Sequence, residues 1–486
     1  MSSKLTADRP QRLRDIGANQ TIRQASLYSA HVRGSIDMAP AADRTGEVRY
    51  WRSTIARSIA VATDAMRPGP VHINMAFDEP LVPDEGADIA WIEPLVGRVE
   101  QRPWTADARL VAGMSTPLDD ILSTLDEQAV VPARGLIIVG DHDAEDAVDL
   151  IDDLADAVGW PVIGEPSANV GSCATALSHG ALVLADATFV HAHAPEIVIT
   201  VGRIGLSRAL IRAVAEAPLH IAVDTSGLWS DPTRSADLVV TSVPLPPEEM
   251  EADEQWLAEW QRADLLASAA VEIALAGHGE VLTGAHVARI AAASVVEQGM
   301  LFVGPSWPVR HVLNFAATSC RDAVVLGNRG TSGIDGCISS AWGAALALQA
   351  NGGGGAIALV GDTTFIYDSN ALSVPAEELR PDLVIVVADN SGGGIFSTLE
   401  QGAERFASVF ERVFGVDPQT DVVALAEAFG VEVHPCTSGA DLDRAIASAQ
   451  EAGGVHVVVA QTCSRGQEAQ ILRSVQQAVG EALATA

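Results

Sequence analysis

Short apolar runs that end at glycine and acidic or amide residues recur along the second half of the chain. The run 357–360 stops just before Asp362, and the run 383–387 stops just before Asn390 and three glycines. Such runs are typical of buried strands. Alternating apolar positions over 365–379 predict a crossover helix between them, which makes one βαβ unit. Parallel strands end at the same sheet edge, so we expect Asp362 and Asn390 to lie close together where open α/β sheets bind ligands.

Similar runs predict a chain of α/β domains. Two linkers rich in proline and acidic residues, 78–103 and 244–251, divide the sequence into segments 1–84, 104–243 and 252–486. The middle segment alternates strand and helix, as doubly wound domains do. The predicted strands are 71–75, 136–139, 197–201, 220–223, 238–241, 301–304, 324–327, 357–360, 383–387 and 455–459. The fold class is therefore α/β, with a parallel sheet in each domain.

The first segment is short for a domain of this class. Leu5 and Thr6 resemble the end of a strand, and a helix with Trp51, Ile55, Ile59 and Ala62 on one face follows before the strand 71–75. A complete α/β domain needs roughly 150 residues, and the first segment has only 84. We therefore expect the first domain to be incomplete, with a start codon called too far downstream.

Composition restricts the classes of partner. The chain has 30 basic and 63 acidic residues and a net charge of −33, which argues against nucleic acid and anionic membranes. No signal peptide is visible, and the uncharged stretch 336–361 contains polar residues and glycines that argue against a membrane span. Five cysteines form no CxxC pair, so neither a disulfide framework nor a zinc site is expected from them. These observations predict a cytoplasmic protein.

The pair Asp362 and Asn390 suits a hard metal ion. Carboxylate and amide oxygens bind Mg²⁺, and phosphate oxygens complete its coordination shell. Gly392 to Gly394 would let the backbone approach a diphosphate. The segment resembles the diphosphate-binding motif of thiamine-diphosphate enzymes, which consists of GD, about 25 to 30 further residues, and then N with a glycine two positions later. The usual GDG of that motif is GDT in this sequence, and the usual NN is DN. An ordinary strand, turn and helix is the alternative interpretation.

Two further strand-following loops carry arginine. Ser306 and Arg310 lie in PSWPVR, and Arg329 lies in GNRGTSGIDG. Both loops are expected at the edge that holds Asp362, where a guanidinium group would pair with small carboxylates. Surface arginines paired with some of the many acidic residues are the alternative.

Four segments together resemble one enzyme family. They are LTADRP…RDIGANQTIRQ (5–24), PSWPVR (305–310), GNRGTSGIDG (327–336) and GDTTFIYDSNAL…DNSGGGIF (361–396). They look like 2-succinyl-5-enolpyruvyl-6-hydroxy-3-cyclohexene-1-carboxylate (SEPHCHC) synthases, the thiamine-diphosphate transferases of menaquinone biosynthesis. The resemblance implies decarboxylation of 2-oxoglutarate and addition of the resulting carbanion to isochorismate, on three doubly wound domains.

The resemblance also implies residue roles. Asp362, Asn390 and the Gly392 carbonyl would hold Mg²⁺ or Mn²⁺ on the thiamine diphosphate, and Ile334 would be the wedge that bends the cofactor. Ile395 and Phe396 would line the thiazolium side. The substrate-binding residues would be Gln20, Arg208, Ser306, Arg310 and Arg329. Arg310 and Arg329, together with the wedge Ile334, would be catalytic. At Arg208 the chain departs from the family, because the family's neighbouring lysine is Ser207.

One family feature has no counterpart in this sequence. The glutamate that activates the aminopyrimidine belongs to the early part of the first domain, and neither Glu47 nor Glu79 stands in the right context. The family places the cofactor between subunits, so a homodimer or tetramer is expected. Two alternatives stay open: another thiamine-diphosphate 2-oxoacid decarboxylase or acetohydroxyacid-synthase-like enzyme, and a truncated protein that binds the cofactor without turnover.

Overall fold

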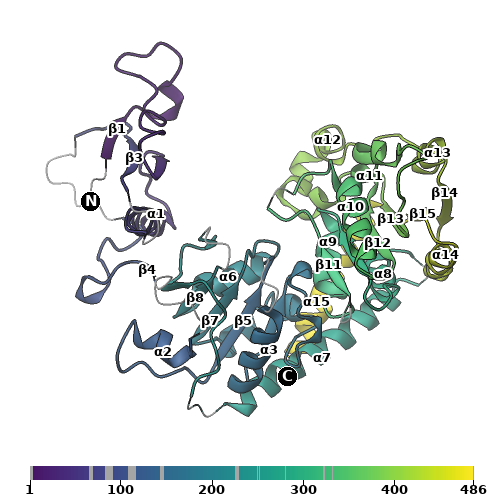
Figure 1. The fold of residues 1–486 in the computed structure, drawn as a ribbon, viewed down its shortest axis with the longest axis horizontal. Helices are drawn as coiled ribbons and strands as arrows, with labels where there is room; N and C mark the ends of the chain where they lie inside the picture. The colour runs from purple at the N-terminus through teal and green to yellow at the C-terminus, as the bar shows by residue number, and fades with distance from the viewer. Residues whose placement is uncertain are drawn as a thin grey trace.

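Three parallel β-sheets, one after another along the chain, organise the fold. The structure, a computed structural model, describes residues 4–64, 69–82, 91–107, 116–142, 147–224, 229–248, 250, 252–279, 281–320, 323–330 and 332–484. The sheets have three, six and six strands. In Figure 1 the N-terminal sheet and the C-terminal sheet lie at opposite ends of the molecule, with the central sheet between them. The sequence-based boundaries 1–84, 104–243 and 252–486 stay a proposal, and each range contains one sheet.

The N-terminal unit is a small sheet covered by one helix. Its elements are β1 (Lys4–Asp8), β2 (Gly34–Met38), α1 (Glu47–Ala62) and β3 (Val71–Ala76). The strand order is β1-β3-β2. The carboxylate of Glu93 accepts the N–H groups of Gly46 and Val48 at 2.7 and 2.8 Å, which caps the start of α1. Ile55 and Ile59 on this helix are 42% and 57% exposed.

The central sheet is buried between helices. Its order is β4-β9-β8-β7-β5-β6, and its interior strands consist mostly of buried apolar residues, as expected for a parallel sheet covered on both faces. The elements are β4 (Ala106–Asp107), α2 (Leu118–Ser123), β5 (Gly135–Val139), α3 (Ala147–Val158), β6 (Val162–Gly164), α4 (Gly180–Val183), α5 (Ala187–Ala192), β7 (Ile197–Val201), α6 (Arg208–Glu216), β8 (His220–Val223) and β9 (Leu238–Val240).

The C-terminal sheet has the order β11-β10-β12-β13-β15-β14. Its elements are α8 (Gly284–Ala293), β10 (Met300–Val303), α9 (Trp307–Phe315), β11 (Val324–Leu326), α10 (Cys337–Ala350), β12 (Ala356–Gly361), α11 (Asp362–Asp368), β13 (Leu383–Asp389), α12 (Ala407–Phe410), α13 (Val422–Ala428), β14 (Glu432–Cys436), α14 (Gly439–Ala452) and β15 (Val455–Gln461). The chain order reverses between β10 and β12. The carboxyl ends of these two strands therefore flank the crevice where doubly wound folds bind ligands.

The predicted βαβ unit around Asp362 is confirmed, but its helix is shorter than predicted. β12 and β13 pair in parallel, with Gly361 opposite Ala388. Instead of a helix over 365–379, α11 begins at Asp362 itself and gives way to a 3-10 turn, Ser369–Leu372. Pro375 and Pro381 follow this turn, and proline disfavours helix both at its own position and at the residue before it.

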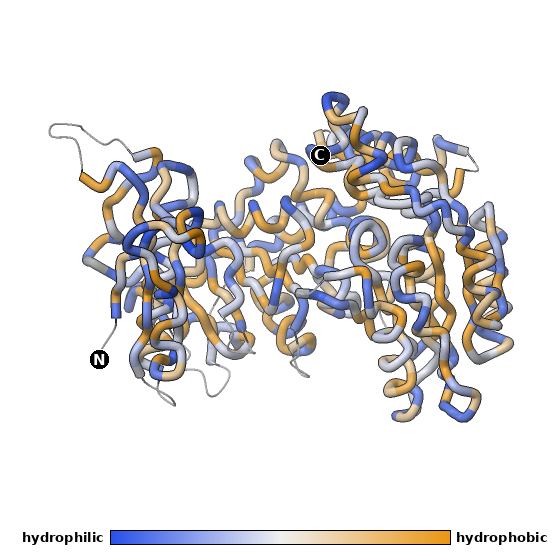
Figure 2. Tube along the Cα trace, turned by 90° about the horizontal axis from the view of Figure 1, so that it is seen from above, coloured by the Kyte–Doolittle hydropathy of each residue, from blue (hydrophilic) through white to orange (hydrophobic). Residues whose placement is uncertain are grey.

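Two long helices join the central and C-terminal parts. α7 (Glu254–Ala276) and α15 (Arg465–Leu483) pack along each other, and both contribute to the hydrophobic cluster of the central sheet. The Trp256 indole N–H donates to the carbonyl of Gly135, the first residue of β5, at 2.8 Å. Figure 2 shows hydrophobic segments in the interior and hydrophilic turns on the outside. Within the described residues, none of the helices has both the length and the apolar character needed to cross a bilayer.

Candidate active site

Four loops, at the carboxyl ends of β10, β11, β12 and β13, surround a cavity of about 600 Å³. Nine of the eleven residues that the sequence predicted for the site line this cavity. They are Ser306, Arg310, Arg329, Ile334, Asp362, Asn390, Gly392, Ile395 and Phe396. The loops come from segments up to about 90 positions apart in sequence, and the parallel sheet brings them to one edge.

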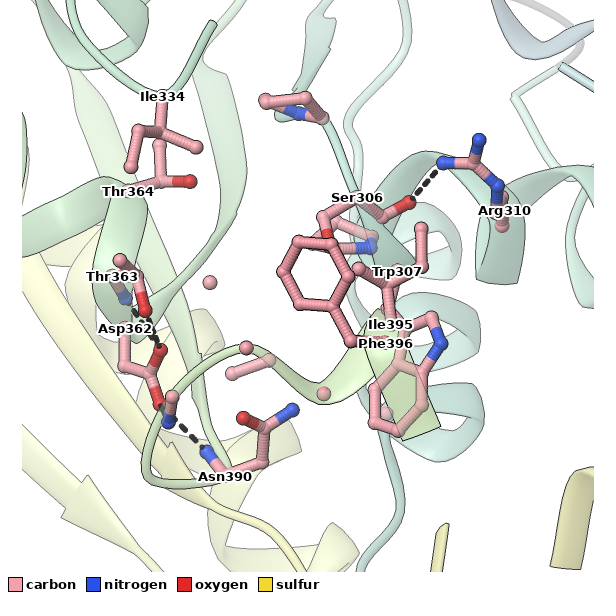
Figure 3. A pocket seen from close by; sticks show the side chains of 18 of the residues that line it. Ser306, Trp307, Arg310, Ile334, Asp362, Thr363, Thr364, Asn390, Ile395 and Phe396 are labelled. Atoms are coloured by element: carbon pink, nitrogen blue, oxygen red, sulfur yellow. Dashed lines mark hydrogen bonds between the residues drawn. The ribbon is translucent and has the colours of Figure 1, made fainter. Parts of the chain in front are cut away.

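Asp362 organises the floor of the cavity. Its side chain is 2% exposed, and its Oδ2 atom accepts the backbone N–H groups of Asn390 at 3.1 Å and Gly392 at 2.8 Å. Its Oδ1 atom accepts the backbone N–H and, at 3.0 Å, the hydroxyl of Thr363. The predicted proximity of Asp362 and Asn390 is confirmed, and Figure 3 shows the carboxylate between the two segments.

The polar groups of this floor fit a divalent cation. The amide oxygen Oδ1 of Asn390 is buried and has no hydrogen-bond partner, although buried polar atoms are normally satisfied. Burial, with the nearby charge of Asp362 adding to it, raises the pKa of Asp389 to about 6. An unsatisfied oxygen beside two mutually repelling carboxylates is stabilised by a hard cation such as Mg²⁺.

The glycine triplet after Asn390 packs tightly against the protein itself. Gly392 has φ +121°, and a Cβ atom placed on it would lie 2.3 Å from the carbonyl oxygen of Gly415. A Cβ atom on Gly394 would lie 2.4 Å from the ring of Trp307. The N–H of Gly393 also donates to the Gly415 carbonyl at 2.7 Å. The sequence assigned these glycines to a diphosphate alone, whereas the structure requires them to admit the 414–416 segment and the indole.

Apolar side chains form the walls above this floor. Figure 3 shows Ile334 beside Thr364 on one side of the cavity, and Phe396 with Ile395 and Trp307 on the other. Ile334 precedes α10, whose N-cap Gly336 has φ 78°. Walls of this kind match the largely apolar lining of cofactor pockets, in which a few polar groups fix the ligand's orientation.

Ser306 and Arg310 lie at the start of α9. Ser306 has φ 72° and ψ −131°, a conformation that side-chain-bearing residues rarely adopt and that clusters at functional sites. Its carbonyl oxygen accepts a hydrogen bond from Nη1 of Arg310 at 2.9 Å. Burial, and then the charge of Arg329, lowers the pKa of Arg310 from its usual value. Two guanidinium groups that repel each other in a cavity create a site for an anion.

A carboxylate from the central domain stands near these arginines. Glu165 is 3% exposed, and its Oε1 accepts the N–H groups of Gly205 and Leu206 at 2.8 and 2.6 Å. Burial raises the pKa of Glu165, while the two backbone donors, Arg329 and Arg310 oppose the rise. Glu165, Gly205 and Arg329 also line an adjoining cavity of about 440 Å³. The central domain therefore contributes charge to the arginine region.

Gln20 and Arg208 lie outside the residues that line the cavity. Gln20 belongs to the N-terminal unit, has φ 57°, and accepts a hydrogen bond from Arg9 at 3.0 Å. Arg208 is the exposed first residue of α6, and Ser207 caps that helix with its side chain. Within the N-terminal unit, Glu47 is buried and pairs with Arg44 at 2.7 Å, whereas Glu79 is exposed.

Sequence reasoning missed several residues of the site. Thr363, Thr364, Tyr367, Trp307 and Phe414 line the cavity. The first three follow directly from the GDTT segment once α11 is known to start at Asp362, and Trp307 lies inside the PSWPVR segment. Nothing in the sequence near Glu165 or Phe414 indicated a site, because tertiary packing alone brings them there.

Comparisons with known proteins agree with the geometry. Residues 317–460 match the family "Thiamine pyrophosphate enzyme, C-terminal TPP binding domain". A SEPHCHC synthase from Thermobifida fusca is 40% identical over 482 residues, which is 99% of this chain and 82% of that protein. Enzymes of the same name from Saccharopolyspora erythraea (40% identical, 88% of this chain and 73% of that protein) and Bacillus cytotoxicus (32%, 85% and 70%) also match. The chain belongs to the 2-succinyl-5-enolpyruvyl-6-hydroxy-3-cyclohexene-1-carboxylate synthase family of thiamine-diphosphate enzymes.

Proposed function

We propose that this protein is a transferase that decarboxylates 2-oxoglutarate and joins the remaining four-carbon unit to isochorismate, giving SEPHCHC in menaquinone biosynthesis. The observation that carries the proposal is the convergence of Arg310 and Arg329 with Asp362 and Asn390 on one cavity, in a chain whose relatives bear that enzyme's name. Both substrates carry carboxylates, which the two guanidinium groups would bind.

The floor and walls of the cavity would hold thiamine diphosphate. Asp362, Asn390 and the carbonyl of Gly392 would bind Mg²⁺ or Mn²⁺ on the diphosphate, and Ile334, Ile395 and Phe396 would contact the cofactor's rings. When bound, this cofactor supplies a carbanion nucleophile and a positively charged ring that accepts the electron pair released with CO₂. The unsatisfied oxygen of Asn390 supports the metal assignment.

The remaining residues would bind and place the substrates. Arg310, held by the Ser306 carbonyl, would fix one carboxylate, Arg329 would fix another, and the Ser306 hydroxyl would donate to a substrate oxygen. Each charge-assisted hydrogen bond would contribute about 1.5 to 3 kcal/mol. Gln20 and Arg208 complete the proposed substrate-binding set. Gly205, three positions before Arg208, is among the residues that line the cavity.

We further propose that the site is completed by a second subunit, in a homodimer or tetramer. Gln20 belongs to the N-terminal unit, which lies at the end of the molecule opposite the C-terminal sheet (Figure 1). A second copy of the chain can bring this residue to the cavity. The exposed Ile16 (69%) and Ile22 (65%) flank Gln20 and offer apolar surface for such a contact. We also place the protein in the cytoplasm, which suits its five free thiols.

The test is an assay of the purified protein with thiamine diphosphate, Mg²⁺, 2-oxoglutarate and isochorismate. Loss of isochorismate that depends on 2-oxoglutarate, with a product of the expected mass, is the expected result. Consumption of another 2-oxoacid without isochorismate loss would indicate a different decarboxylase. Cofactor binding with no turnover of any 2-oxoacid would indicate a binding protein, and either result would refute the proposed function.

A further inference from the structure

A second group of potential metal ligands lies at the opposite end of the C-terminal sheet from the active site. Glu432 and His434 belong to the edge strand β14, and His456 belongs to its neighbour β15. One ligand atom from each of the three residues lies within 4.8 Å of the other two. The strand register explains this: Glu432 pairs with His456, and side chains two positions apart on a strand share a face. All three therefore project from the same face of the sheet.

The hydrogen bonds of His456 leave one ring nitrogen ready to bind a cation. Its Nε2 lies 2.8 Å from the carbonyl oxygen of Gly453, an atom that can only accept, so Nε2 carries the proton. In the neutral ring Nδ1 then has a free lone pair. This arrangement, one nitrogen fixed by a carbonyl and the other available, is the one found in metal-binding histidines.

The distances between the donor atoms match a small coordination shell. His456 Nδ1 lies 3.4 Å from His434 Nε2 and 3.8 Å from Glu432 Oε2. His434 Nε2 lies 3.7 Å from Glu432 Oε1. Two ligands at tetrahedral positions on Zn²⁺, each about 2.0 to 2.1 Å from the ion, are about 3.3 to 3.4 Å apart. The two histidines approach different oxygens of Glu432, so a small rotation of this exposed carboxylate, with shifts of a few tenths of an ångström, would bring the three side chains onto one ion.

The surroundings favour positive charge. Gly453 caps the carboxyl end of α14, where the partial negative charge of the helix dipole attracts cations. His456 is buried with a side-chain exposure of 7%, while Glu432 is 66% exposed and would leave a coordination position for water. Two imidazoles and one carboxylate suit borderline ions such as Zn²⁺, whereas Mg²⁺ prefers oxygen ligands alone.

We propose that Glu432, His434 and His456 form a second metal site, which binds a divalent ion of the zinc class and ties the edge strand β14 to β15. Thr462, which lines the active-site cavity, lies six positions after His456 at the other end of β15. This separation corresponds to about 20 Å along a strand. The ion would therefore stabilise the C-terminal sheet without taking part in catalysis.

The test separates this site from the magnesium site by its metal preference. Protein treated with chelator and desalted is first saturated with thiamine diphosphate and Mg²⁺, and then titrated with Zn²⁺ by calorimetry and with Co²⁺ by visible absorption. We expect one Zn²⁺ per chain, intense Co²⁺ bands typical of four-coordination, and a higher Tm. His434→Ala and Glu432→Ala, both on the accessible side of the site, should each weaken Zn²⁺ binding at least about tenfold.

His191→Ala is the matched control, because His191 is exposed and has a second histidine two positions away in sequence. This variant should bind Zn²⁺ as the wild type does. Zn²⁺ binding that is lost in His191→Ala but unchanged in His434→Ala would overturn the proposal. So would the absence of Zn²⁺ binding at micromolar concentrations, whether or not the enzyme is active.

Discussion

Asn169 of the central domain hydrogen-bonds both backbone groups of Val325 in the C-terminal sheet. Its Oδ1 accepts the Val325 N–H at 2.7 Å, and its Nδ2 donates to the Val325 carbonyl at 3.3 Å. Val325 is the middle residue of β11, the edge strand of that sheet. One amide side chain thus occupies the place of a neighbouring strand. β11 leads directly into the loop that carries Arg329 and Ile334, so the central domain fixes the start of that loop.

Replacing Asn169 should loosen this loop. Asn169→Gly suits the residue's φ of 58° but removes both hydrogen bonds, and we expect a loss of about 1 to 3 kcal/mol of unfolding free energy. The KM for the substrates should rise. Chemical denaturation and steady-state kinetics measure the two effects. Asn351→Ala is the control. It removes one exposed hydrogen bond from a side-chain amide at the end of α10 and should change neither quantity appreciably.

Asp362 should be required for binding the cofactor with its metal. Asp362→Asn keeps the shape of the side chain but removes the charge, and the loss of charge-assisted contacts of about 1.5 to 3 kcal/mol corresponds to a roughly 10- to 150-fold weaker affinity. Calorimetric titration with thiamine diphosphate and Mg²⁺ measures it. Asp421→Asn alters an exposed helix cap in the same domain. Equal cofactor affinity in the two variants would contradict the metal assignment.

The two cavity arginines should act on substrates rather than on the cofactor. Arg310→Ala and Arg329→Ala should each lower kcat/KM for 2-oxoglutarate or isochorismate roughly 10- to 150-fold, because each loses a charge-assisted bond, while the Kd for thiamine diphosphate stays unchanged. Arg444→Ala removes an exposed pair with Asp441 on α14 and serves as the control. Wild-type kinetics in both cavity variants would contradict the proposal that the two arginines bind substrate carboxylates.

Mixed oligomers test whether Gln20 acts across a subunit interface. Gln20→Ala and Arg329→Ala proteins, each of low activity, are combined by unfolding and refolding together. If Gln20 serves the partner's cavity, a hybrid dimer contains one site with both substitutions and one site with neither. The activity of the mixture should then exceed the sum of the activities of the two proteins refolded separately. No gain, with hybrids demonstrated by mass spectrometry, would place Gln20 outside the partner's site.

Acid should destabilise the central domain through His220. This histidine is buried, with Nε2 2.9 Å from Thr200 Oγ1 and Nδ1 3.0 Å from Ser235 Oγ. Burial lowers its pKa to about 4, so the unfolded chain binds a proton between pH 6.5 and pH 4 that the folded protein does not. The unfolding free energy should therefore fall as pH drops through this window, by up to about 1.4 kcal/mol per pH unit from this group.

The contribution of His220 is isolated by replacement. Urea unfolding of His220→Gln from pH 7 to pH 4 should show a shallower pH dependence than the wild type, and the exposed His191→Gln should show the wild-type dependence. An identical slope in His220→Gln would mean that other groups cause the acid sensitivity. Buried His311, whose pKa burial lowers to about 3, is one such group.

The sequence predicted the strands of the two large sheets well, because continuous apolar runs report burial on both faces. The predicted runs 197–201 and 220–223 coincide with β7 and β8. β2, β4, β6 and β14 escaped detection. β4 and β6 are only two and three residues long. β2 (GSIDM) contains polar residues, and β14 (EVHPC) contains polar residues and a proline, which edge strands tolerate and which interrupt the apolar signal.

The candidate site was predictable where a motif lies on a strand end, and not where packing between distant segments creates it. Asp362 and Asn390 meet because their strands are parallel neighbours. Glu165 approaches the arginines only because two domains pack together, and no local pattern encodes that contact. Ile55 and Ile59 have helical spacing typical of a core face, yet they are exposed. Spacing identifies an apolar face but does not say which surface covers it.

The packing of α15 on α7 has a consequence for how the protein is made. α7 leaves the ribosome before the C-terminal sheet, and α15 leaves it after that sheet, so the groove that α15 fills stays open while most of the domain is synthesised. Trp260 of α7 and Val475 of α15 share one buried cluster. Until the last helix arrives, the nascent chain exposes this apolar surface, and transiently exposed surface of this kind promotes aggregation.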